Sequence, residues 1–148
     1  MTSPAIRPAR LSDGEQLLPL LHQLGYPTSG EEVSRRLARL IQAPSVGVLV
    51  AADHEGSEVI GLGTFQIIEL LERPAPQCRI TALVVRADHR RRGIGAALVE
   101  AIAEVARQRG CFRLELTTRP DRQEALPFYT ALGFTVRPHR LVMDLDRE

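Results

Sequence analysis

Apolar and polar positions along the chain follow two different periods, and the period changes at short turn-forming segments. Apolar residues recur at helical spacing over residues 12–24, 29–41 and 93–109, as in amphipathic helices with one buried face. Residues 5–9, 46–52, 59–71 and 79–85 are instead typical of strands, being rich in β-branched residues or alternating in polarity. The pattern therefore predicts helices interleaved with strands, which is the arrangement of an α/β or α+β domain.

Capping and turn residues indicate where these elements begin and end. Ser12 is a candidate N-cap for the first helix, and Ser29 with Glu32 forms a capping box for the second. The strands at 46–52 and 59–71 are expected to form a β-hairpin through a turn at residues 53–56. Gly110 is expected to end the third helix.

The chain after residue 110 predicts further strands and one more helix. Residues 112–118 alternate between apolar and polar positions, which indicates a strand. Leu126, Tyr129 and Leu132 then recur at helical spacing, and Gly133 stands where a glycine ends a helix. Residues 134–136 and 140–145 are predicted to form the last strands.

Composition narrows the class of protein. The 148 residues are 44% hydrophobic and 25% charged, so we expect one globular domain spanning residues 1–148. The formal net charge of +1 gives no overall basic excess that would favour nucleic acid as a partner. No apolar run is long enough to span a membrane, and two cysteines do not indicate a disulfide framework. A cytoplasmic protein with no membrane partner is expected.

The stretch from Val85 to Ala96 carries the strongest functional signal. A strand leads through a basic loop into a helix, and a helix N-terminus offers free N–H groups and a positive dipole end to an anion. Gly93 and Gly95 remove side chains where a phosphate would approach the backbone. Mobile positive charge is added by three loop residues, Arg90, Arg91 and Arg92. The pattern predicts a pyrophosphate-binding loop.

Two common phosphate loops do not fit these residues. A Walker A loop needs four residues between its glycines and a Lys-Ser/Thr pair after them. A dinucleotide-binding fingerprint needs a third glycine, and this chain has Leu98 at that position. Two alternatives to a pyrophosphate-binding loop stay open. The segment is either a solvated, basic helix start without a ligand or an arginine cluster that contacts nucleic acid.

Two motifs resemble those of one known superfamily. Arg90-x-x-Gly93-x-Gly95 is similar to the acetyl-coenzyme A loop of the GNAT superfamily of N-acetyltransferases, where the pattern is Arg/Gln-x-x-Gly-x-Gly/Ala. The run from Ala125 to Phe134 resembles the superfamily signature Ala-x-x-Phe-Tyr-x-x-Leu-Gly-Phe. The resemblance implies the GNAT fold, a mixed and mostly antiparallel sheet of about seven strands flanked by about four helices. Its element order is the one the pattern predicts, β-α-α-β-β-β-α-β-α-β-β.

The resemblance also implies an activity, the transfer of acetyl from acetyl-CoA to a primary amine of a small molecule or protein within a ternary complex. Main-chain groups of Leu83, Val84 and Val85 would pair with the pantetheine arm, and a strand N–H near Val85 would polarise the thioester carbonyl. Tyr129 would protonate the departing thiolate, because a tyrosine hydroxyl stays protonated at neutral pH. The pyrophosphate would bind to the loop and helix start, which comprise Arg90, Arg91, Arg92, Gly93, Ile94, Gly95 and Ala96.

The general base is not where many members of the superfamily have it. Their glutamate lies four residues before the strand-ending valine, and this chain has Thr81 there. Glu115 is the first candidate for the base, Glu69 and Glu72 are others, and Thr81 is a candidate to hold a water that relays the proton.

The missing glutamate also fits a second class of function, a non-catalytic acyl-CoA-binding or sensor domain with the same fold. For either class we expect no metal, and for the enzyme an amine substrate that is a small molecule or a peptide. Homodimers are common in proteins of this kind, and the last strands would offer an edge for one.

Overall fold

The computed structural model describes residues 4–53, 58–119 and 123–145. The chain divides into two compact units, Met1–Thr117 and Thr118–Glu148. A single domain over the whole chain therefore stays a prediction, and each unit is described by itself. Within the described residues no helix is both long enough and apolar enough to cross a lipid bilayer.

The first unit contains a five-stranded sheet with the strands in sequence order. The strands are β1 (Ala5–Pro8), β2 (Val46–Ala52), β3 (Val59–Ile68), β4 (Gln77–Val85) and β5 (Leu114–Glu115). Strands β1 to β4 pair antiparallel, and β5 pairs parallel to β4. The mixed, mostly antiparallel sheet expected from the sequence is confirmed. The expected hairpin of β2 and β3 is confirmed too, although residues 54–57 of its turn lie outside the described residues.

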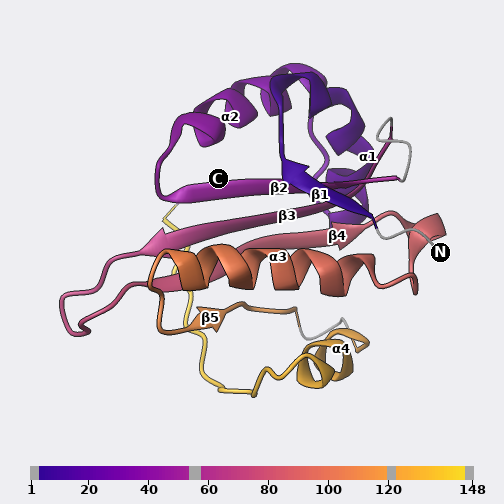
Figure 1. The fold of residues 1–148 in the computed structure, drawn as a ribbon. Coiled ribbons are helices and arrows are strands. Elements are labelled where there is room, and N and C mark those ends of the chain that lie inside the picture. Colours follow the sequence, from indigo (N-terminus) through magenta and orange to yellow (C-terminus); the bar gives the residue numbers. More distant parts are fainter. Residues whose placement is uncertain (1–3, 54–57, 120–122, 146–148) are drawn as a thin grey trace. The chain divides into compact units, whose positions relative to one another are not determined.

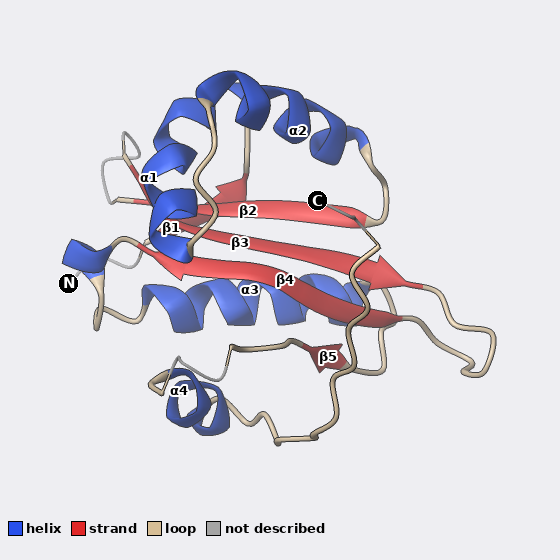
Figure 2. Cartoon of the chain, turned by 180° about the vertical axis from the view of Figure 1, so that it is seen from behind, coloured by secondary structure: helices blue, strands red, loops and turns tan. Residues whose placement is uncertain are grey.

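Three helices cover the two faces of this sheet (Figure 1). Helices α1 (Gly14–Leu24) and α2 (Gly30–Gln42) lie on one face, and α3 (Ile94–Gln108) lies on the other. Figure 2 shows the same layers from behind. Leu98 and Ile102 of α3 are fully buried, and a Cβ added at Gly61 of β3 would lie 3.1 Å from Leu98. The absence of a side chain at Gly61 therefore lets α3 pack directly on the sheet.

Two of the helix boundaries follow the expected capping residues and one does not. The Ser29 side chain accepts a hydrogen bond from the Glu32 N–H at 3.2 Å, and Gly110 closes α3 with φ +76°. Ser12 is not the first N-cap, because it lies inside a 3₁₀ turn (Leu11–Asp13) and the cap position falls on Asp13. The Asp13 carboxylate accepts from the Arg10 N–H at 2.7 Å and pairs with Arg7, so both contacts hold the 3₁₀ turn that precedes α1.

The prediction of about seven strands is wrong, because the sheet of the described residues has five. The strand expected over residues 112–118 is reduced to β5, which pairs with β4 over two residue pairs. No strand forms over residues 134–136 or 140–145. Between them Pro138 lacks an N–H for a ladder, and His139 has φ +81°, which interrupts an extended backbone.

The second unit contains the helix expected around Tyr129, α4 (Ala125–Ala131). The Gly133 N–H donates to the Thr130 carbonyl, and the Phe134 N–H donates to the Tyr129 carbonyl, both at 3.0 Å. With Gly133 at φ +103°, these bonds form a Schellman motif, which confirms the expected helix end. Pro127 is tolerated because it lies in the first turn, where backbone N–H groups have no helical acceptor.

Candidate active site

Strand β4 is paired on its outer edge only near its beginning. Its ladder with β5 ends at the pair Arg79 and Glu115. Thr81 follows as the extra residue of a β-bulge, at the point where the register with β3 shifts. A bulge bends and twists the strand that carries it, which accounts for the separation of β4 from β5 at this point.

Beyond the bulge, the backbone groups of β4 alternate between β3 and the outer edge. The Arg86 N–H donates to the Ile60 carbonyl at 2.9 Å, so Val84, two residues earlier, also bonds to β3. Leu83 and Val85 therefore direct their N–H and C=O groups to the edge that β5 no longer pairs within the described chain. Val84 places its side chain in the core instead, where 7% of it is exposed. An extended ligand with amide groups can pair with this edge as a strand would.

The helix that follows this strand begins without a capping side chain. Gly93 occupies the N-cap with φ +77°, and the first turn of α3 contains no acidic residue. The first helical bond runs from the Ala97 N–H to the Gly93 carbonyl at 3.0 Å. The N–H groups of Ile94, Gly95 and Ala96 have no acceptor inside the helix, so they and the helix dipole favour an anion at this end.

Three adjacent cations precede this helix end. Arg90, Arg91 and Arg92 are exposed, and none forms an ion pair with any residue that the structure describes. Arg91 has φ +66°, an uncommon left-handed conformation for a residue with a side chain. The loop therefore presents uncompensated positive charge together with backbone donors.

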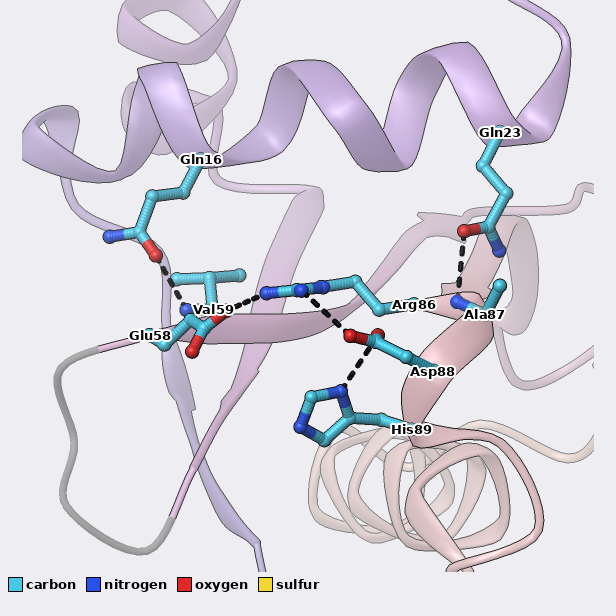
Figure 3. A network of polar contacts seen from close by, with 8 residues as sticks. All are labelled: Gln16, Gln23, Glu58, Val59, Arg86, Ala87, Asp88 and His89. Atoms are coloured by element: carbon cyan, nitrogen blue, oxygen red, sulfur yellow. Dashed lines mark hydrogen bonds and ion pairs between the residues drawn. The ribbon is translucent and has the colours of Figure 1, made fainter.

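The first part of the same loop is held by its own charge network (Figure 3). Arg86 pairs with Glu58 and, at 2.9 Å, with Asp88. Asp88 also contacts His89 Nδ1 at 2.9 Å, and this hydrogen bond, with the charge of Arg86, lowers the pKa of the Asp88 carboxyl. The network anchors the start of the loop and leaves the three following arginines unpaired within the described part.

One residue that no sequence motif marks contacts this junction as well. Gln23 of α1 donates from Nε2 to the Val85 carbonyl at 2.6 Å and accepts at Oε1 from the Ala87 N–H at 3.1 Å. The side chain lies more than sixty positions before its partners in the sequence, so only the packing of α1 on the sheet brings them together.

The candidates for a general base lie in different surroundings. Glu115 is half-buried, and its Oε1 accepts from Arg79 at 2.9 Å and from Gln77 at 3.1 Å. Thr81 is exposed at the bulge, with its hydroxyl 2.6 Å from that of Thr64. The remaining two candidates are exposed in the turn between β3 and β4, at the opposite end of β4 from Val85, and are Glu69 and Glu72.

Tyr129 belongs to the second unit and is partly exposed there. Its ring makes edge-on contacts with Phe128, at 4.9 Å between ring centroids, and with Phe134, at 5.5 Å. These contacts restrict the rotation of the ring, so the direction of its hydroxyl is set by α4 and its closing turn.

The first unit thus combines a mostly antiparallel sheet, a parallel edge strand that leaves part of β4 unpaired, and an uncapped, basic start of α3. The chain belongs to the Acetyltransferase (GNAT) family, whose family model matches residues 15–134. It is 27% identical to glucosamine 6-phosphate N-acetyltransferase of Trypanosoma brucei brucei over 142 residues, covering 92% of this chain and 94% of that one. It is 28% identical to aminoglycoside N(6')-acetyltransferase type 1 of Klebsiella aerogenes, covering 90% and 91% of the two chains. Among solved structures, an acetyltransferase of Trypanosoma brucei superposes with a TM-score of 0.82 at 26% identity, covering 97% of this chain and all of that one.

Proposed function

We propose that this protein is an acetyl-CoA-dependent N-acetyltransferase that acetylates a primary amine of a small molecule or protein directly, within a ternary complex. The observation that carries the proposal is the continuous path from the open edge of β4 to the uncapped start of α3. This path offers strand-like amide donors followed by an anion site, which suits a ligand that joins an amide-containing chain to a pyrophosphate.

The residues along this path divide the binding of acetyl-CoA between them. Leu83 and Val85 would pair with the pantetheine amides, while Val84 supports the strand from the β3 side. The backbone N–H groups from Arg91 to Ala96 would hold the pyrophosphate, and the guanidinium groups of the loop would add charge. When bound, acetyl-CoA supplies an acetyl group already activated as a thioester, so positioning by these residues accounts for much of the rate.

Two side chains are assigned to proton transfer. The Tyr129 hydroxyl would donate its proton to the leaving sulfur. The Glu115 carboxylate, whose Oε1 is paired with Arg79, would accept the proton of the substrate ammonium. A water held by Thr81 is the alternative acceptor, with the Thr64 hydroxyl as the next group in the relay.

The acceptor that we propose to test first is an amino sugar. The two relatives described above are named for glucosamine 6-phosphate and for aminoglycosides, and both of these compounds carry a primary amine on a sugar ring. A cytoplasmic location and a homodimer stay predictions from the sequence.

The second candidate function is a sensor that binds acyl-CoA without turnover. It is favoured by the hydroxyl at position 81 and by the engagement of Glu115 with Arg79 and Gln77. The two functions share the cofactor site and differ only in proton transfer, so a turnover measurement separates them.

The test begins with calorimetric titration of acetyl-CoA into the purified protein, with desulfo-CoA and with pantetheine, which lacks the pyrophosphate, as matched ligands. Binding that requires the pyrophosphate supports the site. Thiol release is then followed with glucosamine 6-phosphate, glucosamine, an aminoglycoside and a lysine-containing peptide. Turnover with any amine supports the enzyme, binding without turnover supports the sensor, and no binding contradicts both.

A further inference from the structure

Gln23 connects a helix on one face of the sheet to the segment where β4 becomes the arginine loop. The residue lies in the last turn of α1 and is half-buried. Its carboxamide makes one hydrogen bond to the carbonyl of Val85 and one from the N–H of Ala87, at 2.6 and 3.1 Å. Figure 3 shows the side chain extending from α1 toward Ala87.

The chemistry of this contact requires a carboxamide. The Val85 carbonyl needs a donor and the Ala87 N–H needs an acceptor, and a carboxamide offers one of each in a single plane. Only one orientation of the amide satisfies both partners, so the assignment of Nε2 and Oε1 follows from the backbone. The two bonds together hold the backbone on both sides of Arg86.

The same contact settles which backbone groups of β4 stay available at the outer edge. Val85 directs both its N–H and its C=O to this edge, and Gln23 occupies the C=O. The N–H groups of Leu83 and Val85 and the Leu83 carbonyl remain for a ligand strand. Gln23 thus ends the edge at Val85 and fixes the direction in which the chain leaves it.

Gln16, on the same helix, provides a natural comparison. Its Oε1 accepts from the Val59 N–H at 2.7 Å, which ties α1 to the start of β3. Both glutamines join α1 to the sheet backbone, but only Gln23 contacts the segment that leads to the anion site. Loss of either glutamine removes α1–sheet hydrogen bonding, but only the loss of Gln23 removes direct contacts with Val85 and Ala87.

We propose that Gln23 is a positioning residue for acetyl-CoA, which holds the end of β4 and the start of the arginine loop in the conformation that binds the pantetheine arm and the pyrophosphate together. The inference rests on the proposed function, because it assumes acetyl-CoA as the ligand. Gln23 itself touches only backbone of this chain, so its effect on binding is transmitted through Val85 and Ala87.

The experiment compares Gln23→Leu with Gln16→Leu in the full chain. We expect Gln23→Leu to weaken acetyl-CoA binding in calorimetry about 5- to 30-fold, because two backbone hydrogen bonds that order the site are lost. The KM for acetyl-CoA should rise by a similar factor, while kcat at saturating acetyl-CoA changes less than about 2-fold. Gln16→Leu should lower the melting temperature and leave the affinity within about 2-fold of the wild type.

Gln23→Glu adds a readout that a purely structural role would not change. At low pH the carboxyl group introduced by this substitution is protonated, and it then offers the same donor and acceptor as the glutamine. The affinity of Q23E for acetyl-CoA, relative to the wild type at the same pH, should therefore rise as the pH falls from 8 toward about 4, where the glutamate carboxyl becomes protonated. The other ionisable groups beside the contact are His22 on α1 and Arg86, Asp88 and His89 on the loop, and because both proteins contain them, the wild type measured at each pH is the control.

The outcomes separate this inference from the proposed function. If the wild type binds acetyl-CoA and Gln23→Leu binds it equally well, the positioning role is overturned and the proposed function stands. If both glutamine variants lose affinity to the same extent, the effect is general destabilisation and the inference is again overturned. A wild type that binds no acetyl-CoA contradicts the proposed function and removes the basis of the inference with it.

Discussion

The hydroxyl oxygens of Thr64 and Thr81 lie 2.6 Å apart across β3 and β4, at the bulge. The pair occupies the place where a glutamate is common in the GNAT superfamily. A threonine hydroxyl stays protonated at neutral pH, so it relays a proton but does not keep one. In the proposed reaction, the proton of the amine would therefore end on a carboxylate such as Glu115 or pass through this pair to water.

The first prediction distinguishes these two routes with Glu115→Gln. If Glu115 is the base, this change should lower kcat/KM for the amine at pH 7 about 10²-fold or more. The matched control is Arg79→Gln, which breaks the same half-buried ion pair but keeps the carboxylate, and it should retain most of the activity. Activity that survives in Glu115→Gln and falls in Thr81→Val would assign the step to the relay instead.

The second prediction concerns Tyr129. Tyr129→Phe keeps the ring contacts with Phe128 and Phe134 and removes only the hydroxyl. We expect kcat to fall about 10²-fold with an unchanged Kd for acetyl-CoA, because an acid acts on the transition state. The pH–rate profile should also lose the alkaline limb that reports the ionisation of the acid. Unchanged turnover would exclude the role.

The third prediction uses two glycines at the two ends of α3. Gly93 and Gly110 have φ of +77° and +76°, and a Cβ added at either would meet no atom within 4 Å. Alanine at either position should therefore cost only backbone strain, about 1 kcal/mol of the free energy of unfolding. Gly93→Ala should in addition weaken acetyl-CoA binding, and Gly110→Ala should not. Equal affinities in the two variants, measured by calorimetry, would contradict the loop assignment.

The fourth prediction follows from the ion pair between Asp13 and Arg7, at 2.8 Å. The hydrogen bond from Arg7 is the main cause that lowers the pKa of Asp13 in the folded protein. The ionised Asp13 carboxylate stabilises the fold fully above the pKa of an aspartate in the unfolded chain, about 3.9. This stabilisation is lost as the pH falls through the lower pKa that Asp13 has in the folded protein. Asp13→Asn should lower the free energy of unfolding by about 2 kcal/mol at pH 7. Urea titrations should show that the difference from the wild type becomes smaller below about pH 4. A difference that is constant down to pH 2 would contradict the assignment.

The fifth prediction concerns the two thiols. Cys78 is fully buried, and burial raises its pKa to about 12, while burial also raises the pKa of the partly exposed Cys111. The thiolate is the reactive form, so iodoacetamide at pH 8 should label native Cys111 slowly and leave native Cys78 unlabelled. Peptide mapping by mass spectrometry, with a urea-unfolded sample as the control, measures both rates. Rapid labelling of Cys78 in the native protein would show that the core opens.

The sequence was sufficient to predict helix ends and strands that are marked by residues close to them in the chain. The cap at Ser29, the closing glycines of α3 and α4 and the four antiparallel strands all follow from residues near each boundary. The signal for the proposed anion site is also local, because a strand, a loop with Gly93 and a helix start are consecutive in the chain. Periodicity and backbone conformation depend on neighbouring residues, so a sequence is sufficient to read them.

The tertiary structure determined those features that depend on contacts between residues far apart in the sequence. The length of β5 depends on which strand edges are paired, and alternation of polarity does not report this. The contact of Gln23 with Val85 depends on the packing of α1 over β4. The sequence by itself determined the family and the order of the elements as far as α3, and it predicted the phosphate loop. The open edge of β4 and the side chains that hold it arise only when distant segments pack, because hydrogen bonds between such segments have no local signature.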